Sequence, residues 1–320
     1  MTYACRAFPG GIPMEGFESM TNVDGVITRT ADARIPVMDR GFLYGDSVYE
    51  VFRTYGGIPL FYDEHWERFE NSAALIHLEL ELTKEQMAGE IRQTVQTTNA
   101  AERGRDVYVR YTVTRGEGAI DLFPRPGLRQ RYVIIVKALQ DWDPKYYTEG
   151  VRLAITPTRR NAISALDPNI KGGNYLNNVL GVIEARTLGA DDCLMLNHAG
   201  QVTECSNSNV FFVLDGQLVT PARTAGNLRG LTKEAVHRAC EANRVATYER
   251  EIGAAALIEA TECFVTSATR EVMPVKSLRL GDGTEIEFPS GGGSLTQRVR
   301  GYYREYVDAY LNAHEHLSMF

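Results

Sequence analysis

The sequence predicts an α+β fold with two domains. The chain has 320 residues, which is more than one ordinary domain holds. Strand-like and helix-like segments follow one another without the strict βαβ alternation of a parallel α/β sheet. The segment 138–148 contains aspartates, a tryptophan and Pro144, a composition typical of a linker. We therefore expect a small N-terminal domain at 1–137 and a larger C-terminal domain at 149–320.

The first domain is expected to be a sheet with two helices. Apolar and polar side chains alternate over 47–55, and a glycine pair supplies the turn of a hairpin into 58–62. Apolar residues at helical spacing predict a helix that begins near Asp63. The other expected elements are short strands at 26–27 and 34–38, a helix at 83–97, and strands at 106–114 and 131–136.

The second domain is expected to begin with a strand at 150–156 and to end with a helix at 295–311. No internal repeat is visible in it. The other expected elements are helices at 174–188 and 230–243, and strands at 192–196, 208–214, 262–266 and 272–275.

The composition indicates a globular metabolic protein of the cytoplasm. Hydrophobic residues make up 44% of the chain and charged residues 23%. The net charge of −7 gives no basis for binding nucleic acid or an anionic membrane. No apolar run approaches the length of a membrane span, and the N-terminus lacks the apolar segment of a signal peptide. We expect no nucleic-acid partner and no membrane association.

The cysteines and histidines indicate neither disulfides nor a metal site. The five cysteines are odd in number and have no CxxC pair, so reduced and mostly buried thiols are expected. His314 and His316 form an isolated HxH without a third ligand nearby in the sequence, which favours a solvated tail. We expect no metal.

The most informative motif joins a lysine to a glutamate further along the chain. Lys171 is followed by Glu204, then by Ser206 and Asn209, and then by a Leu-Arg-Gly-Leu-Thr-Lys run at 228–233. This pattern resembles that of the class IV aminotransferases, the pyridoxal 5′-phosphate (PLP) enzymes of fold type IV. That family includes branched-chain aminotransferases, D-amino-acid aminotransferases, (R)-amine transaminases and aminodeoxychorismate lyases.

The resemblance covers residues from about 35 to 310 and implies a fold, a cofactor and an assembly. The family fold joins a small α/β open sandwich to a larger pseudo-barrel, with PLP in the cleft between them. Amino donors and keto acids are the implied small-molecule partners. Self-association as a homodimer or larger is also implied, because family active sites borrow a loop from the neighbouring first domain.

Three residues have chemical roles that the resemblance implies. Lys171, otherwise a plain loop lysine, would bond to the cofactor and then move a proton between substrate Cα and cofactor C4′. Such an amine needs its charged form disfavoured by burial and nearby positive charge. Tyr175 would hydrogen-bond the phenolic oxygen of the cofactor; the alternative is a core tyrosine. Glu204, otherwise a residue at a strand end, would keep the pyridine nitrogen protonated, and a pyridinium is the better electron sink.

Three places could hold the cofactor phosphate. The helix that begins after Gly230 offers free backbone N–H groups and the positive end of its dipole. Arg68 matches the phosphate arginine of the family, and the turn at 266–269 matches a third family contact. In that turn Ala268 stands where the family often has threonine, so a neighbouring hydroxyl would have to replace it. The expected cofactor-binding residues are Arg68, Lys171, Tyr175, Glu204, Leu231, Thr232, Ser267, Ala268 and Thr269.

The substrate is indicated by Tyr108 and Arg110, which alternation places on one face of a strand. They resemble the Tyr-x-Arg of branched-chain aminotransferases. The tyrosine and the backbone amides near 268–269 would take the α-carboxylate, and the arginine the distal carboxylate of glutamate. The alternative is a structural arginine paired with a surface acid. The expected substrate-binding residues are an aromatic wall together with these groups: Phe42, Tyr44, Tyr49, Tyr108, Arg110, Ala268 and Thr269.

We therefore predict transamination between an aliphatic, branched-chain L-amino acid and 2-oxoglutarate. A D-amino-acid or (R)-amine transaminase is the alternative, and a lyase is less favoured. The Thr-Arg-Gly at 114–116 matches the D-amino-acid enzymes, but Ile120 and Leu122 stand where their Arg-x-His carboxylate trap would be. The Lys171 context is one residue shorter than in many branched-chain enzymes. Intact Lys171 and Glu204 argue against a non-enzymatic relative.

Overall fold

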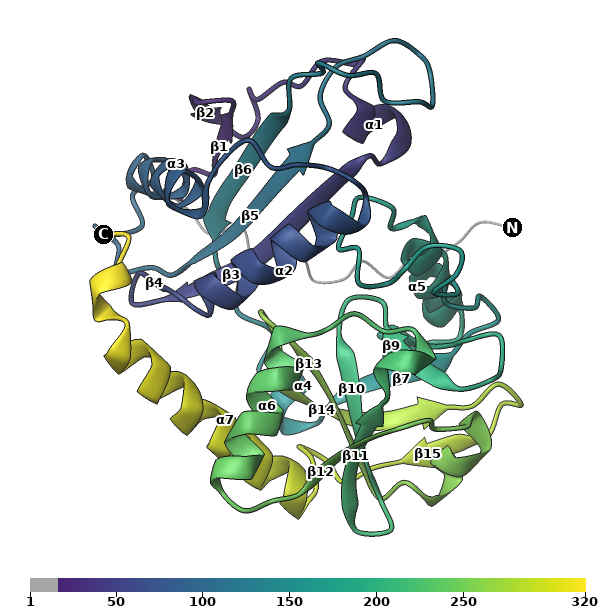
Figure 1. Cartoon of the computed structure of the whole chain (residues 1–320). Coiled ribbons are helices and arrows are strands. Elements are labelled where there is room, and N and C mark those ends of the chain that lie inside the picture. Colours follow the sequence, from purple (N-terminus) through teal and green to yellow (C-terminus); the bar gives the residue numbers. More distant parts are fainter. Residues whose placement is uncertain (1–16) are drawn as a thin grey trace. The chain divides into compact units, whose positions relative to one another are not determined.

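The computed structural model describes residues 17–320, which form two compact units (Figure 1). The N-terminal unit comprises residues 17–141, Ile170–Asn174 and Tyr310–Phe320. The C-terminal unit comprises Trp142–Asn169 and Tyr175–Ala309. Within residues 17–320, the chain passes from the N-terminal to the C-terminal unit between Asp141 and Trp142, inside the segment predicted as a linker, and the N-terminal unit also holds two later segments. The domain limits predicted from the sequence stay a prediction.

The N-terminal unit is a six-stranded antiparallel sheet with strand order β2-β1-β6-β5-β3-β4 (Figure 1). Helix α2 packs on β3, and α3 packs on β1, β5 and β6. The strands are β1 Met20–Val23, β2 Val26–Arg29, β3 Ser47–Tyr55, β4 Ile58–Pro59, β5 Val107–Thr114 and β6 Arg131–Ala138. The helices are α1 Arg40–Tyr44, α2 Tyr62–Leu75 and α3 Lys84–Gln96.

Local chemistry explains most elements of this unit. Strand β3 has the predicted bounds, and α3 lies within the predicted helix because Thr83 and Gln86 form a reciprocal capping box at its start. The hairpin strand is shorter than predicted, because Phe61 takes a left-handed conformation and α2 begins at the next residue. The strand predicted at 34–38 is wrong: that segment is irregular, and two of its apolar side chains are exposed.

The C-terminal unit is a nine-stranded mixed sheet with order β12-β11-β10-β13-β14-β7-β8-β9, and β15 pairs with β14 (Figure 1). Helix α5 packs on β7 and β8, and α6 packs on β12 and β13. The strands are β7 Val151–Ile155, β8 Asp192–Leu196, β9 Val202–Cys205, β10 Asn209–Leu214, β11 Gln217–Pro221, β12 Thr247–Arg250, β13 Glu262–Ser267, β14 Glu271–Arg279 and β15 Glu285–Glu287. The helices are α4 Lys145–Thr148, α5 Leu176–Thr187, α6 Leu231–Ala242 and α7 Ser294–Ala313, with 3₁₀ turns η1 Arg223–Ala225, η2 Ala254–Glu259 and η3 Glu315–Leu317.

The C-terminal segment differs from the solvated tail that was expected. The His314 ring stacks on Tyr310 with 3.9 Å between ring centres, and Met319 is buried in the core of the N-terminal unit. The Met319 N–H donates to the carbonyl of Gly57. These contacts fix the segment, because burial of the apolar Met319 side chain is favourable.

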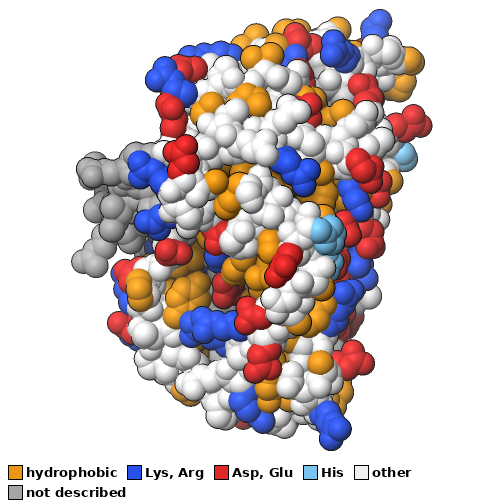
Figure 2. Space-filling view, turned by 90° about the vertical axis from the view of Figure 1, so that its left-hand side faces the viewer, with side chains coloured by type: hydrophobic (Ala, Val, Ile, Leu, Met, Phe, Trp, Pro, Cys, Tyr) orange, Lys and Arg blue, Asp and Glu red, His pale blue; other side chains and the backbone are white. Residues whose placement is uncertain are grey.

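The surface carries charges of both signs. Acidic and basic side chains are interspersed on the face shown in Figure 2. Within residues 17–320, no helix is long and apolar enough to cross a membrane. The same residues contain no group of three or more His, Cys, Asp or Glu side chains that could hold a metal ion. Four cysteines are free and buried, as predicted, and Cys5 lies outside the described residues: Cys193, Cys205, Cys240 and Cys263.

Candidate active site

The loop that carries Lys171 is bound to strand β3 within the N-terminal unit. The Tyr49 N–H donates to the Lys171 carbonyl at 2.9 Å, and Gly173 N–H donates to Ser47 at 3.2 Å. The Lys171 N–H donates to Ser72 Oγ on α2 at 3.1 Å. A Cβ on Gly172 would lie 2.9 Å from the Ser47 carbonyl, so the two glycines after the lysine permit this close approach.

Lys171 lies beside an aromatic side chain and an arginine. Its Nζ is 3.4 Å from the Tyr49 hydroxyl and 4.6 Å from the ring centre. The Arg110 guanidinium carbon lies 3.5 Å from the centre of the same ring. Tyr108, on the same face of β5, is hydrogen-bonded to Arg110. Burial raises the pKa of Tyr108 despite the opposing charge of Arg110, so its phenol is protonated at neutral pH.

Arg110 contacts a tyrosine ring rather than an acid. Within the described part of the chain, no carboxylate lies within ion-pair distance of it. A half-buried guanidinium without a counter-ion is poorly stabilised until an anion binds. The alternative from the sequence was a structural arginine paired with a surface acid. The structure does not contain such a pair at Arg110.

Arg68 is held by a buried carboxylate. Its Nε and Nη2 each donate to Glu50 at 2.7 Å, and His65 Nδ1 lies 2.6 Å from Glu50 Oε2. Burial raises the pKa of Glu50, but Arg68 and His65 overcome this and hold the pKa well below its ordinary value. Burial lowers the pKa of His65, so His65 is neutral and donates its Nδ1–H to the carboxylate. Glu50 therefore fixes the guanidinium predicted to meet phosphate.

Glu204 is a buried carboxylate within the C-terminal unit, on the short strand β9. Arg160 Nε donates to its Oε1 at 2.9 Å, and the Leu228 N–H donates to its Oε2 at 3.0 Å. A carboxylate has about four acceptor sites, so both oxygens retain capacity for a further donor.

The start of α6 offers uncapped N–H groups. Gly230 is the N-cap residue and has no side chain to satisfy the first turn, where Leu231 and Thr232 lie. Asn209 Nδ2 donates to the Leu228 carbonyl at 3.0 Å, and a Cβ on Gly230 would lie 1.7 Å from Asn209 Oδ1. The spacing of the motif thus has a structural cause: Glu204 and Asn209 both hold the loop that leads into α6.

The turn between β13 and β14 contains Ser267, Ala268 and Thr269, all half-buried. Ser267 Oγ accepts from the Arg270 N–H at 3.2 Å, so this hydroxyl is used within the turn. Arg270 Nη1 donates to Asp192 at 2.9 Å and fixes the turn to β8. The Ser267 O–H can still donate to a phosphate, so Ser267 and Thr269 can each supply the hydroxyl that Ala268 lacks.

The remaining predicted residues are on α1 and at the start of α5. Phe42 and Tyr44 are on α1. Phe42 is 65% exposed, and the Arg40 guanidinium carbon lies 5.0 Å from the centre of the Tyr44 ring. Tyr175 is the N-cap residue of α5 and is half-buried. Contacts within the N-terminal unit join Tyr49, Tyr108 and Arg110 to Lys171, whereas Phe42 and Tyr44 belong to a different part of that unit.

Sequence reasoning missed four residues that support the predicted ones. Glu50 holds Arg68, Ser72 holds the Lys171 backbone, Arg160 holds Glu204, and Arg270 holds the 267–269 turn. A buried charge in an apolar strand was the signal for Glu50, since such groups are almost always paired. Nothing in the sequence pattern marked the other three.

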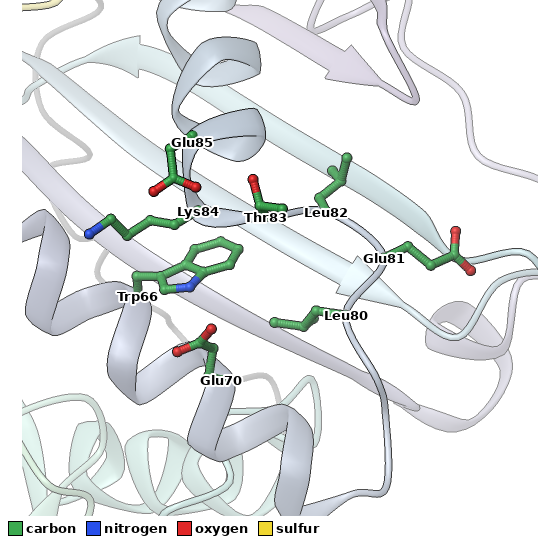
Figure 3. A pocket seen from close by; sticks show the side chains of 8 residues that line it. All are labelled: Trp66, Glu70, Leu80, Glu81, Leu82, Thr83, Lys84 and Glu85. Carbon is green, nitrogen blue, oxygen red and sulfur yellow. The ribbon is translucent and has the colours of Figure 1, made fainter.

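A pocket of about 490 Å³ lies elsewhere in the N-terminal unit and contains none of the predicted residues (Figure 3). It opens between α2, which contributes Trp66 and Glu70, and the segment 80–85 (Figure 3). Lys84 at its rim pairs with Asp63 at 2.9 Å.

Comparisons with known proteins point to one family. The model of the family "Amino-transferase class IV" matches residues 47–278. A putative branched-chain-amino-acid aminotransferase of Methanocaldococcus jannaschii is 31% identical over 88% of this chain and 94% of its own. A D-alanine aminotransferase of Staphylococcus epidermidis is 27% identical over 90% of this chain and 98% of its own. The crystal structure of a branched-chain aminotransferase from Thermoproteus uzoniensis with norvaline superposes with a TM-score of 0.81 at 28% identity, covering 93% of this chain and 98% of that one. The predicted α+β, fold type IV architecture is confirmed.

Proposed function

Because this chain belongs to the class IV aminotransferases, which are PLP-dependent enzymes, we propose that it transfers an amino group between an aliphatic, branched-chain L-amino acid and 2-oxoglutarate. The observation that carries the choice of substrate is Arg110. Its guanidinium has no carboxylate partner in the described chain and lies on the same tyrosine ring as the Lys171 amine. A dicarboxylate that reacts at the amine would supply the missing anion.

The residues fit PLP by their donor chemistry. Lys171 provides the amine for the covalent link, Glu204 a buried carboxylate, and α6 an uncapped helix start for a phosphate. When bound, PLP supplies an electron sink for the carbon that loses its proton. The amide groups of Leu231 and Thr232 and the guanidinium of Arg68 would hold the phosphate, with Ser267, Ala268 and Thr269 as the third contact.

Lys171 is proposed as the acid and base of the reaction. Its backbone is bound by Tyr49 and Ser72, and its amine lies 3.4 Å from the Tyr49 hydroxyl, so the amine has a defined position. That amine would move a proton between substrate Cα and cofactor C4′. Tyr175 is proposed to hydrogen-bond the phenolic oxygen of the cofactor.

Glu204 is proposed to keep the pyridine nitrogen protonated. Arg160 and the Leu228 N–H hold the carboxylate in place and leave acceptor capacity for one more N–H. A carboxylate that faces the pyridine nitrogen favours the protonated ring.

Substrate recognition is proposed to divide between two carboxylate contacts. Tyr108 and the amides at Ala268 and Thr269 would bind the α-carboxylate, and Arg110 the distal one. Tyr49 would contact the aliphatic side chain of the amino donor, and Phe42 and Tyr44 would reach it only from the first domain of a neighbouring subunit. Arg110 serves the dicarboxylate alone, so aliphatic donors do not depend on it.

The Thr-Arg-Gly that resembles the D-amino-acid enzymes has a structural explanation. Arg115 Nε donates to Asp46, and its two terminal nitrogens donate to the carbonyls of Ile76 and His77. A Cβ on Gly116 would lie 1.8 Å from the Arg129 carbonyl, so only glycine fits. This motif therefore carries no information about the handedness of the substrate.

A donor panel tests the proposal. The holoenzyme is given L-leucine, L-glutamate, D-alanine or (R)-1-phenylethylamine, and the half-reaction is followed by the change in cofactor absorbance. We expect the two L-amino acids to react faster than the others. A faster reaction with D-alanine or the (R)-amine would contradict the branched-chain assignment and favour the alternative.

We further propose a homodimer or larger assembly in the cytoplasm. Helix α5 exposes an apolar row at spacings of three and four residues: Leu176, Val179, Leu180 and Ile183. A contiguous apolar row is typical of a contact surface. The four buried free thiols suit a reducing compartment. Light scattering is expected to give at least twice the chain mass of 35.7 kDa, and a fully active species near that mass would contradict the dimer.

A further inference from the structure

Tyr49 contacts Lys171 through three different groups. Its N–H donates to the Lys171 carbonyl at 2.9 Å, its hydroxyl lies 3.4 Å from Nζ, and its ring centre lies 4.6 Å from Nζ. The Arg110 guanidinium carbon is 3.5 Å from the centre of the same ring. One side chain thus contacts both the amine and the arginine of the proposed site.

The position of Tyr49 is fixed by the sheet. It lies in β3, pairs with Thr112 of β5, and is 5% exposed. A ring so enclosed cannot easily change its rotamer. Its hydroxyl can accept a hydrogen bond from an ammonium or donate one to a neutral amine, and its face attracts a cation.

We propose that Tyr49 is the positioning residue of Lys171: its hydroxyl orients the amine for bond formation, and its ring fixes the spacing between that amine and Arg110. The inference rests on the proposed function for the identity of the reactive amine. It gives Tyr49 a role in addition to contact with the substrate side chain.

Other charged or titratable groups act on the Lys171 amine from two neighbouring elements. His65 on α2 is neutral, because burial lowers its pKa. Tyr108 on β5 is protonated, because burial raises its pKa. Arg110 on β5 is a cation that contacts the same tyrosine ring. The Tyr49 hydroxyl is therefore the group whose removal changes a direct contact of the amine and leaves these charges in place.

The test compares Tyr49→Phe with Tyr111→Phe. Tyr111 is a buried tyrosine of β5 in the same unit, and its hydroxyl makes no hydrogen bond among the described residues. The full-length chain, freed of cofactor, is mixed with pyridoxal 5′-phosphate over a range of pH. The amine nitrogen bonds to the aldehyde carbon and water leaves, so the rate follows from absorbance. Reduction with borohydride and mass spectrometry then locate the link.

Tyr49→Phe is expected to lower the rate on the high-pH plateau by about threefold to tenfold, the effect of one lost hydrogen bond. The midpoint of the pH profile should move to lower pH, because the ammonium loses an acceptor. Tyr111→Phe should change neither quantity. A merely structural role for the Tyr49 hydroxyl would leave the midpoint where it is.

The possible outcomes separate the inference from the function on which it rests. If both variants behave like the unsubstituted chain, or lose rate equally, Tyr49 does not position the amine, while a link at Lys171 still supports the proposed function. If the unsubstituted chain forms no link at Lys171, the proposed function fails and the inference fails with it.

Discussion

The two regions that carry the predicted site residues are built in different ways. In the N-terminal unit, side chains hold one another: Tyr49 contacts both Lys171 and Arg110. In the C-terminal unit, backbone N–H groups act beside the side chains: the Leu228 N–H and Arg160 both donate to Glu204, and the first turn of α6 offers its own N–H groups. We infer that the phosphate contacts of the second region tolerate changes of side chain that the first region does not, whereas Glu204 does not share this tolerance.

Ala268 illustrates this difference. The family often has threonine there, yet a backbone N–H remains available whatever the side chain. No such substitute exists for the amine of Lys171 or the guanidinium of Arg110. Each substitution at the site residues of the N-terminal unit should therefore remove one contact and one function, because each of these side chains makes its own contact.

The largest effect is expected from Lys171→Ala. The backbone contacts of this loop do not depend on the side chain, so the protein should fold while turnover and the borohydride-trapped link disappear. Activity assays and mass spectrometry of the trapped protein measure both. Lys84→Ala, at a lysine paired with Asp63, is the matched control and should behave normally. A trapped link on any other lysine would end the assignment.

Glu204→Gln should be the next most severe change. The amide keeps the shape of the side chain but loses the negative charge that stabilises a protonated ring, which is worth on the order of 10²-fold or more in the chemical step. Cofactor loading should fall much less, because the helix start and Arg68 remain. Single-turnover kinetics separate the two quantities. A near-normal single-turnover rate would show that Glu204 is not the partner of the ring.

Arg110→Ala should affect one class of substrate. Loss of a charge-assisted contact costs about 1.5–3 kcal/mol, which is roughly ten- to a hundredfold in kcat/KM for glutamate and 2-oxoglutarate. Half-reactions with leucine or valine should stay nearly intact. Arg53→Ala is a matched control, since Arg53 also lies over a tyrosine ring, at 4.0 Å. Equal loss for all donors would mean that Arg110 is structural or binds the α-carboxylate.

The smallest expected effect concerns stability in acid. The pKa of Glu50 is lower in the folded protein than in the unfolded chain. Glu50 therefore adds to the free energy of unfolding above its ordinary pKa, and this stabilisation is lost as the pH falls. The free energy of unfolding should drop by about 1–2 kcal/mol from this group between pH 5 and pH 3. Urea unfolding measures it. Glu50→Gln should lack this part of the pH dependence, and an unchanged dependence would remove Glu50 as its source.

The sequence could predict elements whose signals are local. The helix at Lys84–Gln96 carries its cap in Thr83 and Gln86, and β3 shows its alternation within nine residues. Strand β9 was missed because it has four residues and all of them are buried, so no alternation is visible. The segment 34–38 looked like a strand because it is apolar, but it has no partner strand.

The same distinction applies to the candidate site. Glu204, Leu231 and Thr232 could be identified from the sequence because one contiguous motif contains them. Arg160 and Ser72 could not be identified, because they lie far from their partners in the sequence. Arg160 is 44 residues from Glu204, and Ser72 is 99 residues from Lys171. Pairing over such distances depends on the packing of strands and helices, which no single segment encodes.

The most direct test of the central claim is the handedness of the product. The holoenzyme is incubated with L-glutamate and 4-methyl-2-oxopentanoate, and the leucine formed is resolved by chiral chromatography. We predict L-leucine as the product, with D-glutamate inactive as the donor. D-leucine as the product, or amino transfer from D-glutamate and (R)-amines alone, would contradict the assignment of this chain to aliphatic L-amino acids.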